Sequence, residues 1–204
     1  SVAKTQTWSI PSTAQCAQCH VPGAGHALSF NTRQLNAFGN IAGSSGNFLK
    51  LLETAGYLNA NLSEDPQIIP KHVRPDETQY SLETRVRSYL DVNCSYCHST
   101  GGGVPNTLWF GKHHLSLGQT KMLDNTLIVP GSPNTSIIRN RAGQLNGATR
   151  MPPLATSIVD QEAVNLLTAW INSMGGYQTY QEWRIAQFGN DTSAEGAPTA
   201  NPDG

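Results

Sequence analysis

The chain of 204 residues is long enough for one or two small domains. Charged residues make up only 13% of it and the net charge is −1, so neither nucleic acid nor an anionic membrane surface is an expected partner. No apolar run approaches the roughly 18 residues of a membrane-spanning helix, and we expect no membrane span. The chain starts at Ser1 without a basic and apolar leader, which indicates a mature or excised piece.

Capping residues and apolar spacing predict short helices in the first part of the chain. Ser12 precedes a short helix that carries the first cysteines. Asn31 is placed to cap a second helix that reaches Phe38, and a Gly/Ser break follows at 43–46. Apolar residues within 48–56 predict a further helix that ends at a glycine.

A polar, proline-containing stretch at 59–79 indicates a boundary between two modules, which we place at 1–79 and 80–176. The remaining residues, 177–204, are predicted to hold a short amphipathic helix at 177–188 and then a linker.

The second module begins with Ser81, a predicted N-cap. Apolar residues then recur at helical spacing as far as Cys94. Residues 104–150 are predicted to be mostly loop. Asp160 caps a last helix with one apolar stripe, which ends at Gly175-Gly176.

Two C-x-x-C-H motifs carry the chemistry of the chain: Cys16-Ala17-Gln18-Cys19-His20 and Cys94-Ser95-Tyr96-Cys97-His98. Cysteines three positions apart lie on one face of a helical turn, so both thiols can reach the two vinyl groups of one porphyrin. The histidine that follows can then ligate the iron. The motifs use all four cysteines of the chain. We therefore predict two covalent c-type haems, with Gly101-Gly102-Gly103 letting the backbone turn close to the second.

Three other interpretations explain less of the pattern. Structural zinc sites usually place about 15–20 residues between their C-x-x-C pairs, far fewer than separate Cys19 from Cys94. A thioredoxin-like redox pair needs a βαβ context that is not found here. Two local disulfides would leave both histidines unexplained.

Met151 is the predicted distal ligand of the second haem iron. It lies in Met-Pro-Pro, between the second motif and the last helix, and prolines stiffen a loop. Its thioether is a soft donor that raises the potential of a haem. Met174 falls on the apolar stripe of the last helix and is expected in the core. Met122, in a polar stretch, is a weaker candidate ligand.

The distal ligand of the first haem is less defined. No methionine lies between His20 and Cys94. His72 lies nearly as far beyond His20 as Met151 lies beyond His98, and it also stands in a proline-flanked loop. We therefore predict that His72 is the distal ligand of the first haem. The alternatives are His26, His113 or His114, or an iron with an open sixth position.

The chain resembles known cytochromes beyond these motifs. Residues 81–174 resemble a class I cytochrome c domain. Five further segments of the wider stretch 6–174 carry a second resemblance: Pro11-Ser12, Asn31-Thr32-Arg33-Gln34-Leu35-Asn36, Ser88-Tyr89-Leu90-Asp91-Val92-Asn93-Cys94, Val129-Pro130-Gly131-Ser132-Pro133 and Met151-Pro152-Pro153-Leu154. On these segments, the stretch resembles the dihaem module of secreted bacterial cytochromes that is often found beside quinoprotein (PQQ-dependent) sugar dehydrogenase-like domains.

The resemblance implies two covalent haems, attached at the four cysteines, and Met151 as a ligand. It does not decide the other distal ligand. No dehydrogenase domain is present in the sequence, so sugar oxidation is not carried over.

We therefore expect an all-α, loop-rich fold with two haem-binding modules, and electron transfer rather than enzyme activity. The expected partner is a redox protein, either a dehydrogenase or a downstream acceptor. Haem is attached to such cysteines outside the cytoplasm, so we expect a periplasmic or extracellular location. One alternative is a self-assembling subunit of an extracellular cytochrome filament. Another is a dihaem peroxidase-like enzyme, which would need an open iron.

Overall fold

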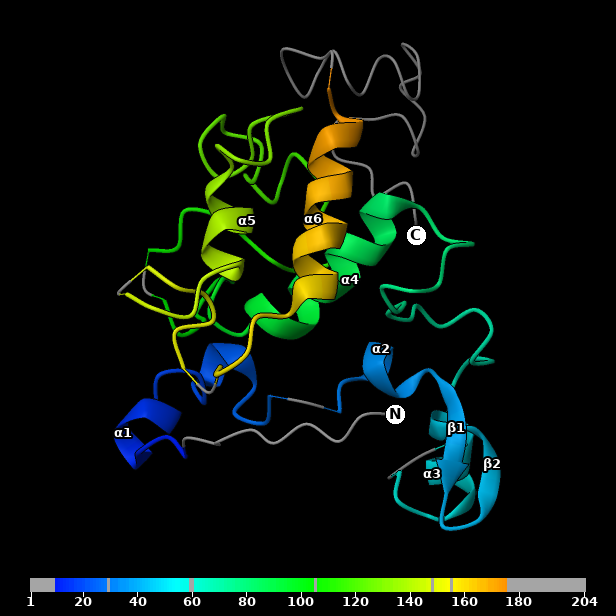
Figure 1. Cartoon of the computed structure of the whole chain (residues 1–204). Coiled ribbons are helices and arrows are strands. Elements are labelled where there is room, and N and C mark those ends of the chain that lie inside the picture. The colour runs from blue at the N-terminus through cyan, green and yellow to red at the C-terminus, as the bar shows by residue number, and fades with distance from the viewer. Residues whose placement is uncertain are drawn as a thin grey trace.

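A computed structural model describes residues 10–28, 30–58, 61–104, 106–147, 149–154 and 156–175. The elements follow in the order α1 (Thr13–Cys16), the 3-10 helix η1 (Pro22–Ala24), α2 (Thr32–Leu35), β1 (Phe38–Ile41), β2 (Ser44–Asn47), α3 (Phe48–Thr54), α4 (Leu82–Cys94), α5 (Ile137–Ala142) and α6 (Gln161–Ser173) (Figure 1). Long irregular segments connect them.

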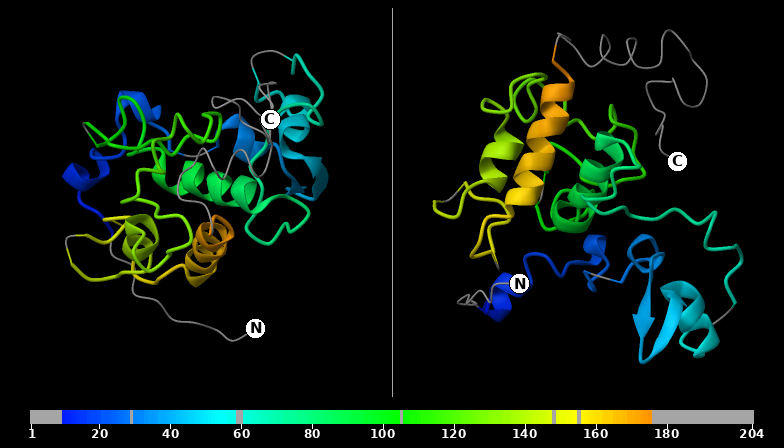
Figure 2. Two further views of the ribbon diagram at one scale, coloured as in Figure 1. Left: turned by 90° about the horizontal axis from the view of Figure 1, so that it is seen from above. Right: turned by 45° about the vertical axis from the view of Figure 1, so that its right-hand side comes forward.

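The hydrophobic core lies between the two longest helices, α4 and α6, which cross in contact while α5 packs beside α6 (Figures 1 and 2). Val86 and Leu90 are one helical turn apart on α4, so they project from the same face. They are buried in one cluster with Leu167, Trp170 and Ile171 of α6. The apolar stripe predicted for the last helix therefore forms half of this core.

The predicted helix starts are confirmed. The side chains of Ser12, Asn31, Ser81 and Asp160 each accept a hydrogen bond from a backbone N–H in the first turn of α1, α2, α4 and α6 respectively. Such caps satisfy donors that a helix cannot pair internally, and each is typically worth about 1 kcal/mol.

The helix predicted to extend from Asn31 to Phe38 is shorter in the structure, where α2 ends at Leu35. Phe38 instead begins β1, which pairs with β2 as an antiparallel hairpin. The turn residues Ala42 and Gly43 have φ values of 50° and 86°, and positive φ at both central positions matches the right-handed twist of paired strands. The predicted Gly/Ser break is therefore the turn and second strand of a hairpin.

The hairpin and α3 form a small lobe to one side of the α4–α6 pair (Figure 2). α3 was expected, and Gly56 takes the left-handed conformation just beyond it, with φ 74°. Helix α5 was not expected, since it lies within the stretch predicted to be mostly loop. The helix predicted at 177–188 lies outside the described residues. Among the residues that are described, no helix has the length and apolar character needed to cross a membrane.

The α4–α6 core makes a direct prediction for stability. Ile171 is 0% exposed, so we expect Ile171→Ala to lower the free energy of unfolding by about 2–5 kcal/mol through lost burial and a residual cavity. The exposed neighbour Asn172 offers a control, and Asn172→Ala should change the free energy of unfolding by less than about 0.5 kcal/mol. Urea unfolding measures both variants. Equal effects would contradict the described packing.

Candidate haem site

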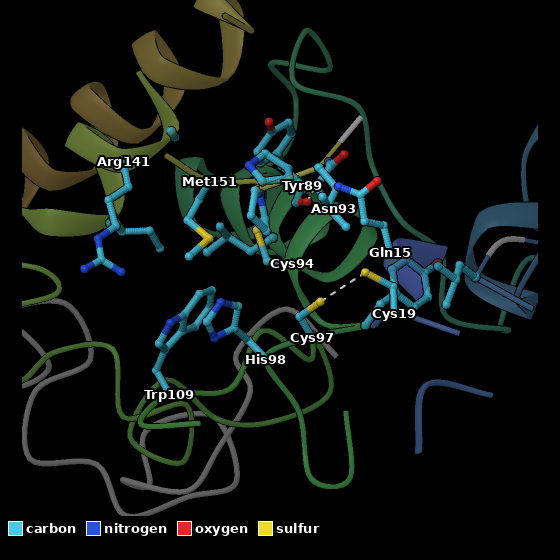
Figure 3. Close-up of a pocket in the computed structure, with 18 of the residues that line it drawn as sticks. Gln15, Cys19, Tyr89, Asn93, Cys94, Cys97, His98, Trp109, Arg141 and Met151 are labelled. Carbon is cyan, nitrogen blue, oxygen red and sulfur yellow. Dashed lines mark hydrogen bonds between the residues drawn. The ribbon is translucent and has the colours of Figure 1, made fainter. Parts of the chain in front are cut away.

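One cavity of about 290 Å³ brings both C-x-x-C-H motifs together (Figure 3). Its walls are mostly apolar and include Leu90, Ile138 and Leu167. The residues of predicted chemical function that line it are Cys16, Cys19, His20, Cys94, Cys97, His98 and Met151. Every predicted site residue except His72 therefore borders the same cavity.

The two motifs adopt the same local structure. The backbone N–H of His98 donates to the carbonyl of Cys94 at 2.8 Å, and that of His20 donates to the carbonyl of Cys16 at 3.0 Å. In both motifs the second cysteine also donates to the carbonyl of the first, at 3.1 Å. Each motif is thus a continuation of the helix before it, α1 or α4, as the sequence pattern requires.

The tautomer of His98 follows from its hydrogen bonds. Thr107 Oγ1 donates its one hydrogen to the carbonyl of Trp109 at 2.7 Å. The same oxygen lies 3.0 Å from His98 Nδ1, so Nδ1 must carry the proton and donate it. His98 Nε2 is then the nitrogen with a free lone pair, as a metal-ligating imidazole needs.

The environment of His98 keeps its ring neutral and oriented. The ring stacks on Trp109, with centroids 4.3 Å apart and planes at 22°. Burial lowers the pKa of His98, and the positive charge of Arg141 lowers it further. A neutral, sterically held imidazole is the form that binds iron.

His20 of the first motif has the same tautomer. Its Nδ1 donates to the carbonyl oxygen of His26, which can only accept, so its Nε2 also keeps a lone pair. His26 Nδ1 lies 3.3 Å from the carbonyl of His20 in return. His26 takes the left-handed conformation, with φ 60°. Both histidines of this pair are exposed, whereas His98 is half-buried.

Met151 lies on the opposite wall of the cavity from His98 (Figure 3). Its backbone N–H donates to the carbonyl of Arg141 in α5 at 3.0 Å. The neighbouring Arg150 guanidinium spans the loop and donates to three backbone carbonyls, those of Leu145, Pro153 and Thr156. The loop is thereby held on both sides of the thioether.

The other two methionines lie elsewhere. Met122 and Met174 are each 1% exposed and belong to the hydrophobic core rather than to the cavity lining. This location matches the expectation for Met174 and leaves Met151 as the methionine beside the second motif. The role of Met151 as a ligand stays a prediction.

His72 lies apart from the cavity, in a buried polar cluster. Its ring makes an edge-on contact with that of His113, with centroids 5.6 Å apart. Its Nε2 lies 3.5 Å from Asp91 Oδ2 on α4. His114 is exposed and lines a separate cavity beside Gly23. The distal ligand of the first haem therefore stays a prediction, and the structure does not bring His72 alongside His20.

The buried cluster has strongly perturbed protonation. Burial lowers the pKa of His113 to about 3, and the nearby charges of Arg87 and Arg33 act in the same direction. Burial also lowers the pKa of His72, against the opposing effect of Asp91. Burial alone would raise the pKa of Asp91, but its hydrogen bonds and the positive charges nearby outweigh that effect and lower it. Both imidazoles are therefore neutral beside an ionised carboxylate.

The residues at the second motif have the chemistry that a covalently bound haem requires. Cys94 and Cys97 are free thiols, His98 offers a lone pair at Nε2, and a thioether stands across an apolar space. Thr107, Arg141 and Arg150 support this arrangement and were not identified from the sequence. Within the described residues, no three or more His, Cys, Asp or Glu side chains gather as ligands for a bare metal ion.

Comparisons of the chain with protein-family models, with curated proteins and with solved structures found no match. Function is therefore inferred from the two motifs and the geometry of the cavity.

The low pKa of His113 predicts a pH-dependent stability. Between pH 6.5 and about 3 the unfolded chain binds a proton at this histidine and the folded chain does not, so stability is lost as pH falls through that window. The loss approaches about 1.4 kcal/mol for each pH unit below 6.5. Urea unfolding at about pH 7 and about pH 4.5 should show it, with His72 adding in the same direction.

The matched variants are His113→Gln and its exposed neighbour His114→Gln. The free energy of unfolding differs between the two pH values, and we expect His113→Gln to reduce this difference by about 2 kcal/mol or more. His114→Gln should keep the wild-type difference. An unchanged pH dependence in His113→Gln would refute the assignment.

Proposed function

We propose that this protein is a dihaem c-type cytochrome that transfers electrons. The observation that carries the proposal is the convergence of both C-x-x-C-H motifs and Met151 on one apolar cavity, with His98 in the tautomer of an iron ligand. A haem held there supplies reversible one-electron chemistry.

The residues around the second motif favour a high potential. Met/His ligation raises the potential of a haem, and Met151 stands opposite His98. The positive charge of Arg141, which acts on His98, also favours the reduced state because reduction lowers the positive charge of the site. The mostly apolar walls lower the local polarity, which strengthens both effects.

The residues of the first motif face a different environment. Cys16 and His20 are exposed, whereas Cys94, Cys97 and His98 are half-buried. We propose that the first haem has two histidine ligands and a lower potential, so that electrons run from the N-terminal haem to the C-terminal one. The exposed motif is the side that a redox partner protein reaches.

The proposal includes a periplasmic or extracellular location, because haem is attached to such motifs outside the cytoplasm. It does not include an enzyme activity. Met151, on the cavity wall opposite His98, is a proposed ligand rather than an acid–base group, so the proposal for the second motif is electron transfer.

The first test counts haems. The intact mass of the denatured protein, produced with haem-attachment machinery, should exceed that of the chain by two haems. The double variants Cys16→Ala/Cys19→Ala and Cys94→Ala/Cys97→Ala should each lose one haem and serve as controls for each other. A mass that matches bare polypeptide or bound zinc would sink the proposal.

The second test concerns the methionine ligand. We expect Met151→Leu, which keeps the apolar volume, to abolish the near-infrared methionine-to-ferric charge-transfer band and to lower the potential of one haem. Met122→Leu and Met174→Leu are the controls, because both residues lie in the core. Survival of the band in Met151→Leu would show that another residue is the ligand.

A further inference from the structure

The two motifs touch each other through their second cysteines. Cys19 Sγ lies 3.4 Å from Cys97 Sγ, although 78 positions separate the residues in the chain (Figure 3). These are two of the four sulfur atoms to which, under the proposed function, haem would be attached. The porphyrins that Cys19 and Cys97 would hold would therefore be attached at sulfur atoms that lie in contact with each other.

Glycines hold the two motif loops at this separation. A Cβ atom at Gly103 would lie 2.0 Å from the carbonyl oxygen of Gln18, inside the first motif, and 3.2 Å from Cys97 Sγ. A Cβ atom at Gly23 would lie 2.0 Å from the carbonyl oxygen of Gly101. Ordinary contacts of a Cβ atom begin at 3.4 Å, so any side chain at Gly23 or Gly103 would push two backbones apart by more than an ångström.

The loop that carries Gly103 is tied by hydrogen bonds to the second motif. The N–H of Gly103 donates to the carbonyl of Tyr96 at 3.0 Å, and the N–H of Val104 donates to that of Cys97 at 3.2 Å. The loop is thus folded back over the second motif. A change at Gly103 is transmitted to the space between the motifs rather than absorbed by the loop.

We propose that Gly23 and Gly103 are positioning residues that set the separation of the two haems and hold them as one electronically coupled pair. The inference rests on the proposed function, since it presumes that both motifs carry haem. It goes further in assigning the contact between the motifs to two glycines that bind neither porphyrin nor iron.

Circular dichroism in the Soret region reads the coupling directly. Two porphyrins at close range exchange excitation, which splits the Soret signal into a couplet whose strength falls steeply with separation. We expect a couplet in the wild-type protein and a loss of its amplitude in Gly103→Ala and in Gly23→Ala. Gly46→Ala is the control, because its Cβ atom would meet only the Leu51 side chain at 3.4 Å, and it should keep the wild-type couplet.

A second comparison does not depend on the glycine variants. The summed spectra of the two single-haem variants, Cys16→Ala/Cys19→Ala and Cys94→Ala/Cys97→Ala, should lack the couplet that the wild type shows. This comparison tests the coupling of the two haems whether or not an alanine variant accumulates. Two attached haems by mass with a wild-type spectrum equal to that sum would overturn the inference, as would unchanged couplets in both alanine variants. Absence of haem by mass would instead refute the proposed function.

Discussion

The position of the cavity depends on the packing of α4 against α6. The last residue of α4 is Cys94, and the helical turn continues through Cys97 to the backbone N–H of His98. Val86 and Leu90 bury the middle of the same helix against Leu167, Trp170 and Ile171. The thiols of Cys94 and Cys97, the imidazole of His98 and the core residues of α4 therefore belong to one continuous helical segment. A shift of α4 against α6 would move all of them together.

A buried polar network ties the loop after the second motif to the same helix. Arg87 of α4 donates to the carbonyls of His113 and Leu115 and pairs with Glu83 at 3.2 Å. Asp91, one turn further on, accepts from the backbone N–H of His113 at 3.1 Å. The loop that supplies Thr107 and Trp109 to His98 is thus anchored to α4 on a polar side, while an apolar side faces the core. Breaking one partner of such a network leaves buried charge behind, which is costly.

Local signals predicted the parts of the fold that depend on a few neighbouring residues. Ser81 and Asp160 cap their helices because a side-chain oxygen three positions from a free N–H can reach it in any tertiary context. The motif turns at Cys16 and Cys94 follow the same logic. The hairpin was not predicted because Phe38 was assigned to the helix that begins at Asn31. Its pairing with Asn47 can be predicted only once the turn between the two strands is recognised.

The surroundings of His72 and the supporting role of Thr107 depend on contacts distant in sequence. His72 was chosen by spacing along the chain, but its surroundings are Asp91 and His113, which no local pattern places beside it. Thr107 has no sequence signal at all, since its role is defined by the carbonyl of Trp109 and the ring of His98. The glycine run after the second motif was expected to allow a close backbone turn. The sequence does not indicate that Gly103 packs against Gln18 of the first motif, and only the three-dimensional structure shows this contact.

The contacts of Arg150 have a consequence for behaviour in salt. Its guanidinium holds the Met151 loop through neutral backbone carbonyls of Leu145, Pro153 and Thr156 rather than through a carboxylate. Dissolved ions screen attraction between charges over about 10 Å at 0.1 M, but they weaken direct hydrogen bonds to neutral carbonyls less, and the bonds to Leu145 and Thr156 are partly buried. We therefore expect the attachment of the Met151 loop to respond little to ionic strength. Encounters with a charged partner at the exposed first motif, by contrast, would respond to ionic strength, so partner binding and the attachment of the Met151 loop would differ in their sensitivity to salt although both lie at one cavity.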